Sequence, residues 1–190
     1  MDLKRQLPAA MLSFAGGVLG ALLATVIPGG ILTAALPFIL IAIALYFALK
    51  PGMDDIDRAE RLPPFVFGLT VVPLIGFYDG VLGPGTGSFF MLAFVSLAGY
   101  GLLKAAAHTK LLNFASNPGG SVLFALAGAI YWKIGLVMGV AQFFGARLGA
   151  GLAIAKGARL IKPLLVIACV ALAARLLMDP AHPLRMMLGF

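Results

Sequence analysis

Charged residues are scarce in this sequence. Only 14 basic and 7 acidic side chains occur among 190 residues, which is 11% of the chain, whereas soluble domains carry about 25%. Hydrophobic residues make up 62%, and the mean hydropathy is +1.05. A chain with so little charge cannot cover its surface with polar groups, so the composition excludes a water-soluble protein. It predicts an all-α integral membrane protein. The length accommodates about seven membrane segments of roughly 20 residues each.

The sequence also lacks the motifs of enzymes and of cofactor or metal proteins. A single cysteine excludes a disulfide framework. No HExxH, GxSxG, CxxC or GxxxxGK[ST] pattern occurs. We therefore predict no enzyme activity, no cofactor and no metal. The net charge of +7 indicates no nucleic-acid partner, because the basic residues gather in the loops between apolar runs.

Apolar runs separated by short polar stretches predict the membrane segments. If every segment crosses the bilayer, the basic loops collect on the side of the N-terminus, including the charge-dense loop Lys50–Pro64. Basic loops face the cytoplasm, so we expect a multi-pass protein of the bacterial inner (plasma) membrane with a cytoplasmic N-terminus. The expected segments are 7–27, 31–49, 65–82, 88–99, 121–130, 135–155 and 163–177, and the fifth is expected to start earlier than residue 121, near Leu111.

An internal repeat suggests how these segments are organised. Leu19–Ala24 (LGALLA) matches Leu148–Ala153 (LGAGLA), and each is followed by a turn and an apolar run containing Pro37 or Pro163. The two pairs lie five segments apart, and an odd offset inverts one repeat against the other, as in many transporters. We therefore expect 1–49 to be the last two segments of an incomplete first repeat, 50–64 a charged cytoplasmic loop, and 65–190 a complete second repeat.

The most informative stretch is Gly76–Ser88, a polar interruption between two apolar runs. A helix cannot run smoothly through its Gly-Pro-Gly sequence. Inside a bilayer, such a break survives only where it is buried in protein or lines a wet cavity, and transporters hold anions at breaks of this kind. We expect half of an anion site here, and the alternative is a tight turn in a helical hairpin. The expected substrate-binding residues are Gly83, Gly85, Thr86, Gly87 and Ser88.

A second polar stretch, Leu102–Asn117, adds donors. Lys110, Asn113 and Asn117 share one helical face by their spacing. Lys110 is the candidate fixed positive charge for an anion, and Gln142 is a weaker candidate ligand. The alternative is an interfacial helix whose lysines reach the membrane surface. We also expect the Asn-Pro-Gly-Gly sequence that begins at Asn117 to break a helix a second time.

Three ionisable side chains suggest charge pairing or coupling. Asp79 lies near the end of an apolar run, and carboxylates inside membranes are costly unless they are paired or functional. Two roles for Asp79 stay open: it sets the electrostatics of the anion site, or it forms a structural ion pair with Lys110 or Arg147. His108 is a candidate for proton coupling, because its reference pKa is about 6.5. The alternative for His108 is a polar residue at the membrane interface.

Two long blocks of this sequence, GFYDGVLGPGTGSFF at 76–90 and HTKLLNFASNPGG at 108–120, resemble the TauE/SafE family of sulfite and organosulfonate exporters. Residues Gln142–Ala150 and Lys156–Leu165 continue the resemblance. It implies a multi-pass plasma-membrane protein that moves small sulfur-containing anions outward.

The sequence departs from the family pattern at its start, because the family's first-half glycine hairpin and Thr-Asn-Lys block are absent. This predicts an internal methionine taken as the start, a fragment, or a homodimer that completes the site. The function expected is export of small anions. The alternative is a non-transporting membrane subunit or an inactive truncated remnant.

Overall fold

The computed structural model of the chain describes residues 3–27, 29–49, 56–156, 158–179 and 182–183. These residues form helices, turns and loops with no strand among them, which confirms the predicted all-α class. The elements are α1 (Leu3–Ala24), α2 (Gly29–Leu49), α3 (Pro64–Val66), the π-helical stretch η1 (Phe67–Val71), α4 (Val72–Val81), α5 (Thr86–Ser96), α6 (Leu102–Leu126), α7 (Trp132–Lys156) and α8 (Ala158–Leu177).

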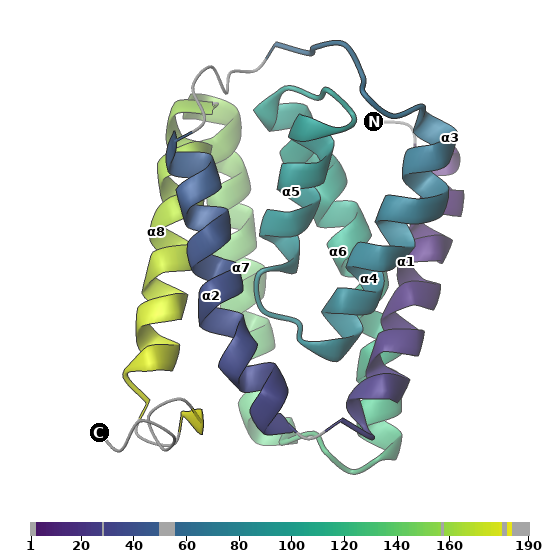
Figure 1. Ribbon diagram of the computed structural model, residues 1–190, viewed down its shortest axis with the longest axis vertical. Helices are drawn as coiled ribbons and strands as arrows, with labels where there is room; N and C mark the ends of the chain where they lie inside the picture. The colour runs from purple at the N-terminus through teal and green to yellow at the C-terminus, as the bar shows by residue number, and fades with distance from the viewer. Residues whose placement is uncertain (1–2, 28, 50–55, 157, 180–181, 184–190) are drawn as a thin grey trace.

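The helices stand side by side and alternate in direction. In Figure 1, α1 runs downward, α2 upward, the continuous α3–η1–α4 stretch downward, α5 upward, α6 downward, α7 upward and α8 downward. Within the described residues, four helical stretches are long and apolar enough to span a membrane: Gln6–Ala24, Pro64–Val81, Trp132–Leu152 and Leu160–Leu177. The charged loop expected at 50–64 is described only from residue 56 onward.

The polar stretch that dominates the sequence forms a hairpin within the bundle. Helix α4 ends at Val81, and α5 begins at Thr86 after a turn in which Gly83 and Gly85 have φ angles of 79° and 90°. Only glycine adopts such angles without strain. Helix α5 has 11 residues, or about 16 Å, which is too short to cross a hydrocarbon core of about 30 Å. Figure 1 places the turn above the lower ends of α1, α2 and α6. The predicted first helix break is confirmed.

The predicted second break is wrong. Helix α6 runs unbroken for 25 residues with Pro118 inside it, so the segment expected at 121–130 belongs to the same helix as the polar stretch before it. Close packing against α1 holds this part of α6 straight. A Cβ atom on Gly17 of α1 would lie 2.4 Å from the Ser116 carbonyl oxygen, and one on Gly119 would lie 2.5 Å from Val18 Cγ2. Membrane helices tolerate proline where neighbouring helices compensate in this way.

Helices α1 and α4 are locked together through glycines on both sides. A Cβ on Gly16 or Gly20 of α1 would lie 2.2 or 2.0 Å from a carbonyl oxygen of α4, and a Cβ on Gly76 or Gly80 of α4 would lie 2.4 or 2.1 Å from one of α1. Both pairs have the four-residue spacing that brings membrane helices into backbone contact. This interlock fixes α4, and with α4 it fixes the polar hairpin.

Candidate substrate site at the break between α4 and α5

The carboxylate of Asp79 is the centre of the polar network in the hairpin. Asp79 lies in the last turn of α4 and is half-buried. The Thr86 hydroxyl, at the start of α5, donates to its Oδ1 at 2.6 Å. The hydroxyl of Ser116 on α6 donates to its Oδ2, and the Asn117 amide approaches the same oxygen at 3.5 Å. One carboxylate therefore ties together three helices.

Each hydroxyl in this network faces more acceptors than it has protons. Thr86 Oγ1 lies 2.6 Å from the Gly83 carbonyl oxygen as well as from Asp79. Ser116 Oγ lies 3.0 Å from the Asn113 carbonyl oxygen as well as near Asp79. A hydroxyl carries one proton, so two hydroxyl protons serve four acceptors. The network has room for one more proton, and the carboxyl group is the group that can carry it.

A polar cavity of about 250 Å³ opens beside this network. Asp79, Ser116, Asn117 and Ser121 supply its polar side chains, and Gly83 and Gly120 bring backbone to its wall. Gly120 and Ser121 lie one turn along α6 from Ser116 and Asn117. The cavity is the size of a small solute and lies beside the α4–α5 turn, because Leu82 and Gly83 line it.

The turn itself is held by its own hydrogen bonds. Tyr78 donates its hydroxyl to the Pro84 carbonyl at 2.6 Å. Gly85 accepts from the backbone N–H of Ser88 at 2.8 Å, and a Cβ on Gly85 would meet Leu40 of α2 at 2.9 Å. The Ser88 hydroxyl lies 3.3 Å from Cys169 Sγ of α8. Ser88 therefore connects the hairpin to α8, while the Thr86 side chain faces the carboxylate.

Of the twelve residues expected in the site, the structure brings five into one place and leaves four apart, while the other three, Gly85, Gly87 and Ser88, lie in the turn or in the first turn of α5. Asp79, Gly83 and Thr86 gather with two amides of α6, Asn113 and Asn117. Asn117 Nδ2 lies 3.3 Å from Asn113 Oδ1, and a Cβ on Gly87 would lie 3.7 Å from Asn113 Nδ2. The residues that lie elsewhere are His108, Lys110, Gln142 and Arg147.

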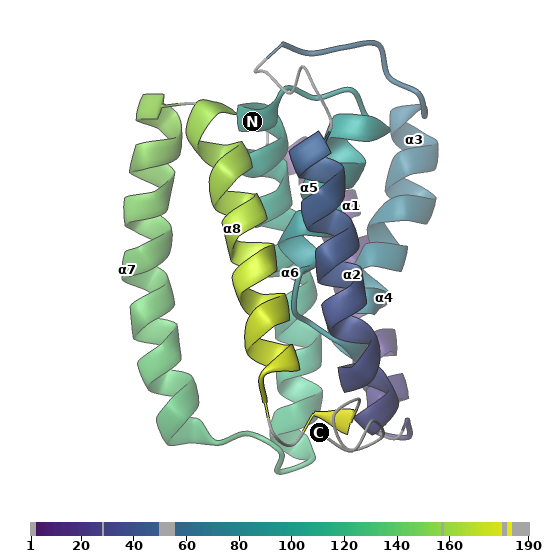
Figure 2. The ribbon, with the colours of Figure 1, turned by 60° about the vertical axis from the view of Figure 1, so that its left-hand side comes forward.

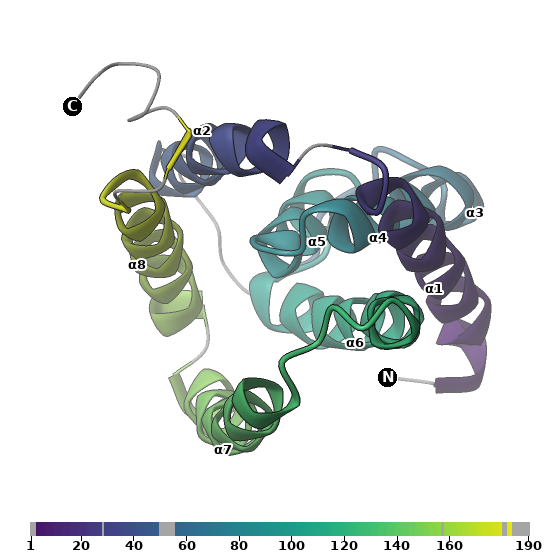
Figure 3. The same ribbon diagram turned by 90° about the horizontal axis from the view of Figure 1, so that it is seen from below.

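The expected ion pair of Asp79 does not form among the described residues, which corrects that expectation. Lys110 lies on the exposed face of α6, and Arg147 lies on α7, which packs against α8 at the edge of the bundle. Figure 3 shows α6 between α7 and α4. Neutral hydroxyl and amide groups take the place of the expected cation. His108 lies near the start of α6, against the rings of Tyr100 and Phe94, with its Nδ1 2.9 Å from the Lys104 carbonyl oxygen.

Sequence reasoning missed Ser116 and Ser121 as members of the site. Ser116 is only 1% exposed, and its hydroxyl contacts Asp79 directly. Its position, next to Asn117 and three residues after Asn113, was the available signal. Of the face predicted from Lys110, Asn113 and Asn117, the two asparagines lie at the network and Lys110 is exposed.

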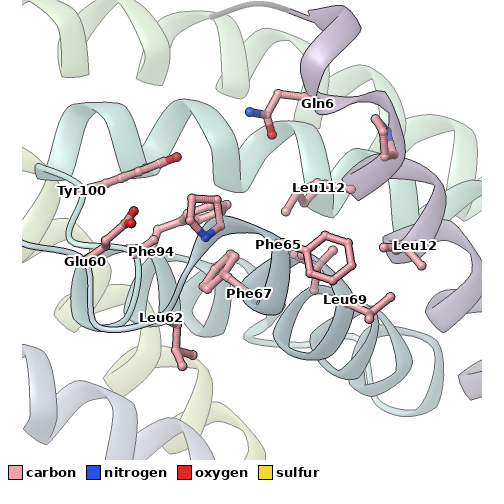
Figure 4. A pocket seen from close by; sticks show the side chains of 16 residues that line it. Gln6, Leu12, Glu60, Leu62, Phe65, Phe67, Leu69, Phe94, Tyr100 and Leu112 are labelled. Atoms are coloured by element: carbon pink, nitrogen blue, oxygen red, sulfur yellow. The ribbon is translucent and has the colours of Figure 1, made fainter.

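A second cavity, of about 260 Å³, lies near the other end of the bundle. Figure 4 shows its mostly hydrophobic lining, with Phe65 and Leu69 near Leu12 of α1, and with Glu60 and Tyr100 at the opposite end. Its walls offer few polar groups to a charged solute. The cavity beside Asp79 is therefore the better candidate site.

Comparisons with known proteins agree with this architecture. The family model described as "Sulfite exporter TauE/SafE" matches residues 1–176. The chain is 66% identical over 189 residues to "Probable membrane transporter protein ORF9" of Sinorhizobium sp, covering 100% of this chain and 72% of that protein. It is 46% identical over 168 residues to "Probable membrane transporter protein YfcA" of Escherichia coli strain K12, covering 88% of this chain and 62% of YfcA.

A "Probable membrane transporter protein" of Haemophilus influenzae is 47% identical over 166 residues, with 87% of this chain and 65% of that protein covered. The chain thus spans about two thirds of the length of these relatives. No solved structure matches it. Because the family model covers most of the chain and the relatives share so much of its sequence, the chain belongs to the TauE/SafE family of membrane transporters.

Proposed function

We propose that the protein exports small anions, such as sulfite or organosulfonates, across the bacterial plasma membrane. The observation that carries this proposal is the polar cavity at the α4–α5 break, at membrane depth, where three helices converge on Asp79. Backbone breaks at this depth are typical of transporter binding sites. The description of the family as sulfite exporters supports the substrate class.

The cavity offers hydrogen-bond donors to an anion, but it also holds a carboxylate. The Asn117 amide and the Ser121 hydroxyl line it. An ionised Asp79 would repel an anion at 4 Å by about 4 kcal/mol at an effective dielectric constant of 20. The groups that face Asp79 from α5 and α6 are the neutral Thr86, Ser116 and Asn117, and α1 contributes glycine backbone there. No cation of the described residues relieves that repulsion.

Proton uptake by Asp79 removes the repulsion between its carboxylate and the anion. The hydroxyls of Thr86 and Ser116 have more acceptors than protons, so a protonated carboxyl fits the network once the hydroxyl that accepts its proton turns to its own backbone carbonyl acceptor. We therefore propose that Asp79 couples anion binding to proton binding. Lys110, about two turns along α6 from Asn117, remains a candidate positive charge on the route to the cavity. Gln142 on α7 has no place in this site.

The orientation follows from the basic residues. Arg58, Arg61 and Lys104 lie in or beside the loops at the end of the bundle where α1 begins, which is the upper end in Figure 1. Basic loops favour the cytoplasmic side. We propose a cytoplasmic N-terminus, which places the opening of the α4–α5 hairpin toward the opposite membrane face.

A flux assay in proteoliposomes tests the proposal. The purified chain is reconstituted, and efflux of sulfite and of methanesulfonate is measured with and without a pH gradient, against chloride and sulfate. Asn117→Ala removes a donor to the anion, so we expect flux to fall at least tenfold, in line with the loss of one charge-assisted hydrogen bond. Asp79→Asn mimics the protonated carboxyl, so anion exchange persists but no longer responds to the pH gradient.

Thr70→Val is the matched control. Thr70 lies on η1, is exposed, and bonds only to the Val66 carbonyl, so its flux equals that of the wild-type chain. If the wild-type chain transports the anion and Asn117→Ala transports it equally fast, the proposed site is refuted. Flux that responds to pH equally in Asp79→Asn and the wild-type chain would refute the coupling role.

The alternative function is that of a non-transporting membrane subunit. The observation in its favour is α7, where Gln142 and Arg147 are exposed and have no hydrogen-bond or ion-pair partner among the described residues. Polar groups on a membrane-facing surface are costly, and a partner chain would cover them. Normal folding with no flux of any tested anion, by this chain alone, would favour the alternative.

A further inference from the structure

The mostly hydrophobic cavity near the start of α3 is separate from the proposed transport site, because it shares no lining residue with the cavity beside Asp79. It encloses about 260 Å³, whereas an apolar cavity of about 150 Å³ already binds benzene. Residues 64–72 of the α3–η1–α4 stretch form one wall. At 1.5 Å per residue the cavity therefore follows this stretch for about 12 Å from its loop end.

The cavity opens toward the membrane-facing surface. Two of its lining residues, Phe65 and Leu69, are 77% and 53% exposed. They belong to Pro64–Val81, a stretch long and apolar enough to span the membrane. The inner wall is closed by the buried side chains of Phe94 and Leu112. A hydrocarbon chain can therefore enter this cavity from the bilayer and meet apolar side chains on its way.

The wall of the cavity at Gly68 leaves room that a side chain could fill. Gly68 lies in the π-helical stretch η1, and a Cβ atom on it would meet no atom within 4 Å. The glycines of the α1–α4 interlock differ, because a Cβ on any of them would overlap the backbone of the other helix. Gly68 thus leaves space instead of permitting close packing. Turns of π-helix are rare and are frequently found at functional sites.

Two polar side chains without partners stand at the loop end of the cavity. Figure 4 shows the Gln6 side chain reaching it from α1 and the Glu60 side chain reaching it from the loop before α3. Neither has a hydrogen-bond or ion-pair partner among the described residues. The nearby Asp57 carboxylate is already paired with Lys104. The rim therefore offers one free carboxylate and one free amide.

The loop that carries Glu60 is fixed against the end of α5. The backbone N–H groups of Arg58 and Arg61 donate to the carbonyls of Gly99 and Leu97, at 2.7 and 2.8 Å. Gly99 has a φ angle of 71°, and a Cβ atom on it would overlap the Arg58 carbonyl oxygen. The Arg61 side chain is exposed and has no partner among the described residues. A negative and a positive group thus lie next to each other in a loop of fixed position.

We propose that this cavity binds a membrane lipid with an ethanolamine headgroup, phosphatidylethanolamine. One hydrocarbon chain occupies the apolar cavity, and the ammonium group donates to the Glu60 carboxylate. The Gln6 amide and the Arg61 guanidinium donate to the phosphate. Pairing each charge of the headgroup with an opposite charge gives strong, charge-assisted hydrogen bonds. This proposal goes beyond the anion-transport proposal and does not depend on it.

Phosphatidylglycerol is a poorer occupant than phosphatidylethanolamine. Its chains fill the cavity equally well, but its headgroup has no ammonium group and places a net negative charge beside Glu60. Like charges at such a distance repel each other. A soluble amine without hydrocarbon chains is also a poorer occupant, because it leaves the apolar walls unfilled and gains no burial of apolar surface.

The test is lipid binding to the purified full chain, measured by native mass spectrometry. The chain in mild detergent is titrated with phosphatidylethanolamine or with phosphatidylglycerol of identical acyl chains, and phosphoethanolamine serves as the probe without chains. Glu60→Gln removes the carboxylate, and Gly68→Leu fills the cavity. Gly139→Leu is the matched control, because Gly139 on α7 also has nothing within 4 Å of its Cβ position.

We expect the wild-type chain to bind phosphatidylethanolamine about fivefold more tightly than phosphatidylglycerol, and Glu60→Gln to bind the two lipids equally. Gly68→Leu should bind phosphatidylethanolamine about tenfold more weakly than the wild-type chain, because the hydrocarbon chain loses its place. Gly139→Leu should bind like the wild-type chain. Since Gly68→Leu fills empty space, its thermal stability should equal or exceed that of the wild-type chain, which shows that it folds.

Three results would overturn the proposal. The first is equal or tighter binding of phosphatidylglycerol by the wild-type chain. The second is binding of phosphatidylethanolamine by Gly68→Leu as tight as by the wild-type chain, which would place the lipid elsewhere on the surface. The third is binding of phosphoethanolamine as tight as that of the lipid, which would make a soluble amine the ligand. Glu60→Gln keeps the proposal testable by itself, because this exposed loop residue is not needed for folding.

Discussion

Helices α1 and α7 carry nearly the same glycine pattern and have opposite environments. A Cβ on Gly20 would lie 2.0 Å from the Phe77 carbonyl oxygen, whereas a Cβ on its repeat partner Gly149 would meet nothing within 4 Å. In a bilayer, lipid solvates an apolar helix about as well as protein does, so helix contacts depend on close backbone packing. A row of glycines therefore shows where another helix can pack closely. Whether one does so depends on the presence of a partner helix.

The polar positions show the same contrast. Ser13 of α1 is fully buried, and its hydroxyl bonds to α6. When Gly149 is aligned with Gly20, Gln142 of α7 takes the position of Ser13, and it is exposed. A glutamine is larger than a serine and carries both donors and acceptors. The surface of α7 thus keeps a polar group at the position of the polar group on α1. This favours a polar contact at Gln142.

The largest effect that separates the two helices is expected from Gly20→Leu. Its side chain would overlap the backbone of α4, including Gly80 Cα at 3.0 Å, so α1 must move off α4. Changes that open an interior contact of this kind reach about 4 kcal/mol or more. The measurement is unfolding in mixed micelles of mild detergent and dodecyl sulfate, followed by circular dichroism.

Gly149→Leu is the paired control for that experiment. In the isolated chain it meets no atom, so its unfolding curve should overlay that of the wild-type chain. An equal loss of stability in both variants would show that α7 is already packed in micelles, and the contrast drawn between the two helices would be wrong.

An intermediate effect is expected from Ser13→Ala. The variant leaves the Leu112 carbonyl without its hydroxyl donor. A side-chain hydrogen bond between membrane helices contributes about 0.6 kcal/mol on average, so we expect a small destabilisation of that order in the same unfolding assay. Gln142→Ala should leave stability unchanged. If the Ser13→Ala variant is as stable as the wild-type chain, the contrast drawn between Ser13 and Gln142 is wrong.

The helical class and the break at Gly83–Gly85 were predictable from sequence, because both depend on local chemistry. Glycine and proline interrupt a helix wherever they cluster, and the positive φ angles of Gly83 and Gly85 confirm that reading. Pro118 was misread for the opposite reason. Its helix persists because α1 approaches within contact distance at Gly17 and Gly119, and such long-range packing leaves no local signal.

The candidate site was predictable in part. Asp79 was predicted because a carboxylate inside a membrane segment is costly, Thr86 because it follows the helix break, and Asn117 because it shares a helical face with Asn113. The three do lie together. The expectation that a cation would balance Asp79 failed, since two hydroxyls and an amide suffice in the structure. Which of several helix faces meets the carboxylate depends on the rotation of α6, and this is set by its packing on α1 rather than by its own sequence.

The smallest effect is expected in the charged loop before α3, in water rather than in lipid. Asp57 accepts from the Gly101 backbone N–H at 2.8 Å, at the start of α6, and pairs with Lys104 Nζ at 2.5 Å. The Gly101 hydrogen bond, followed by Lys104, lowers the pKa of Asp57 below its ordinary value of 3.8. A lowered pKa means that the folded state favours the ionised carboxylate, so its contribution is complete above about pH 4 and is lost as the pH falls through the lowered pKa.

Amide hydrogen exchange at Gly101 measures this contact directly. In the wild-type chain, the protection of the Gly101 amide should decrease as the pH falls below 3.8, after correction for the intrinsic exchange rate. Asp57→Asn cannot ionise, so protection should be lower at neutral pH and independent of pH. Because Asp57 and Lys104 are exposed and screened by water, the loss of protection should stay local. The α1–α4 interlock should be unchanged, because its glycine contacts contain no charge. An acid-induced loss of protection that spread to Gly76 and Gly80 would show that the loop and the interlock form one cooperative unit, and the contrast between lipid-buried and water-exposed contacts would fail.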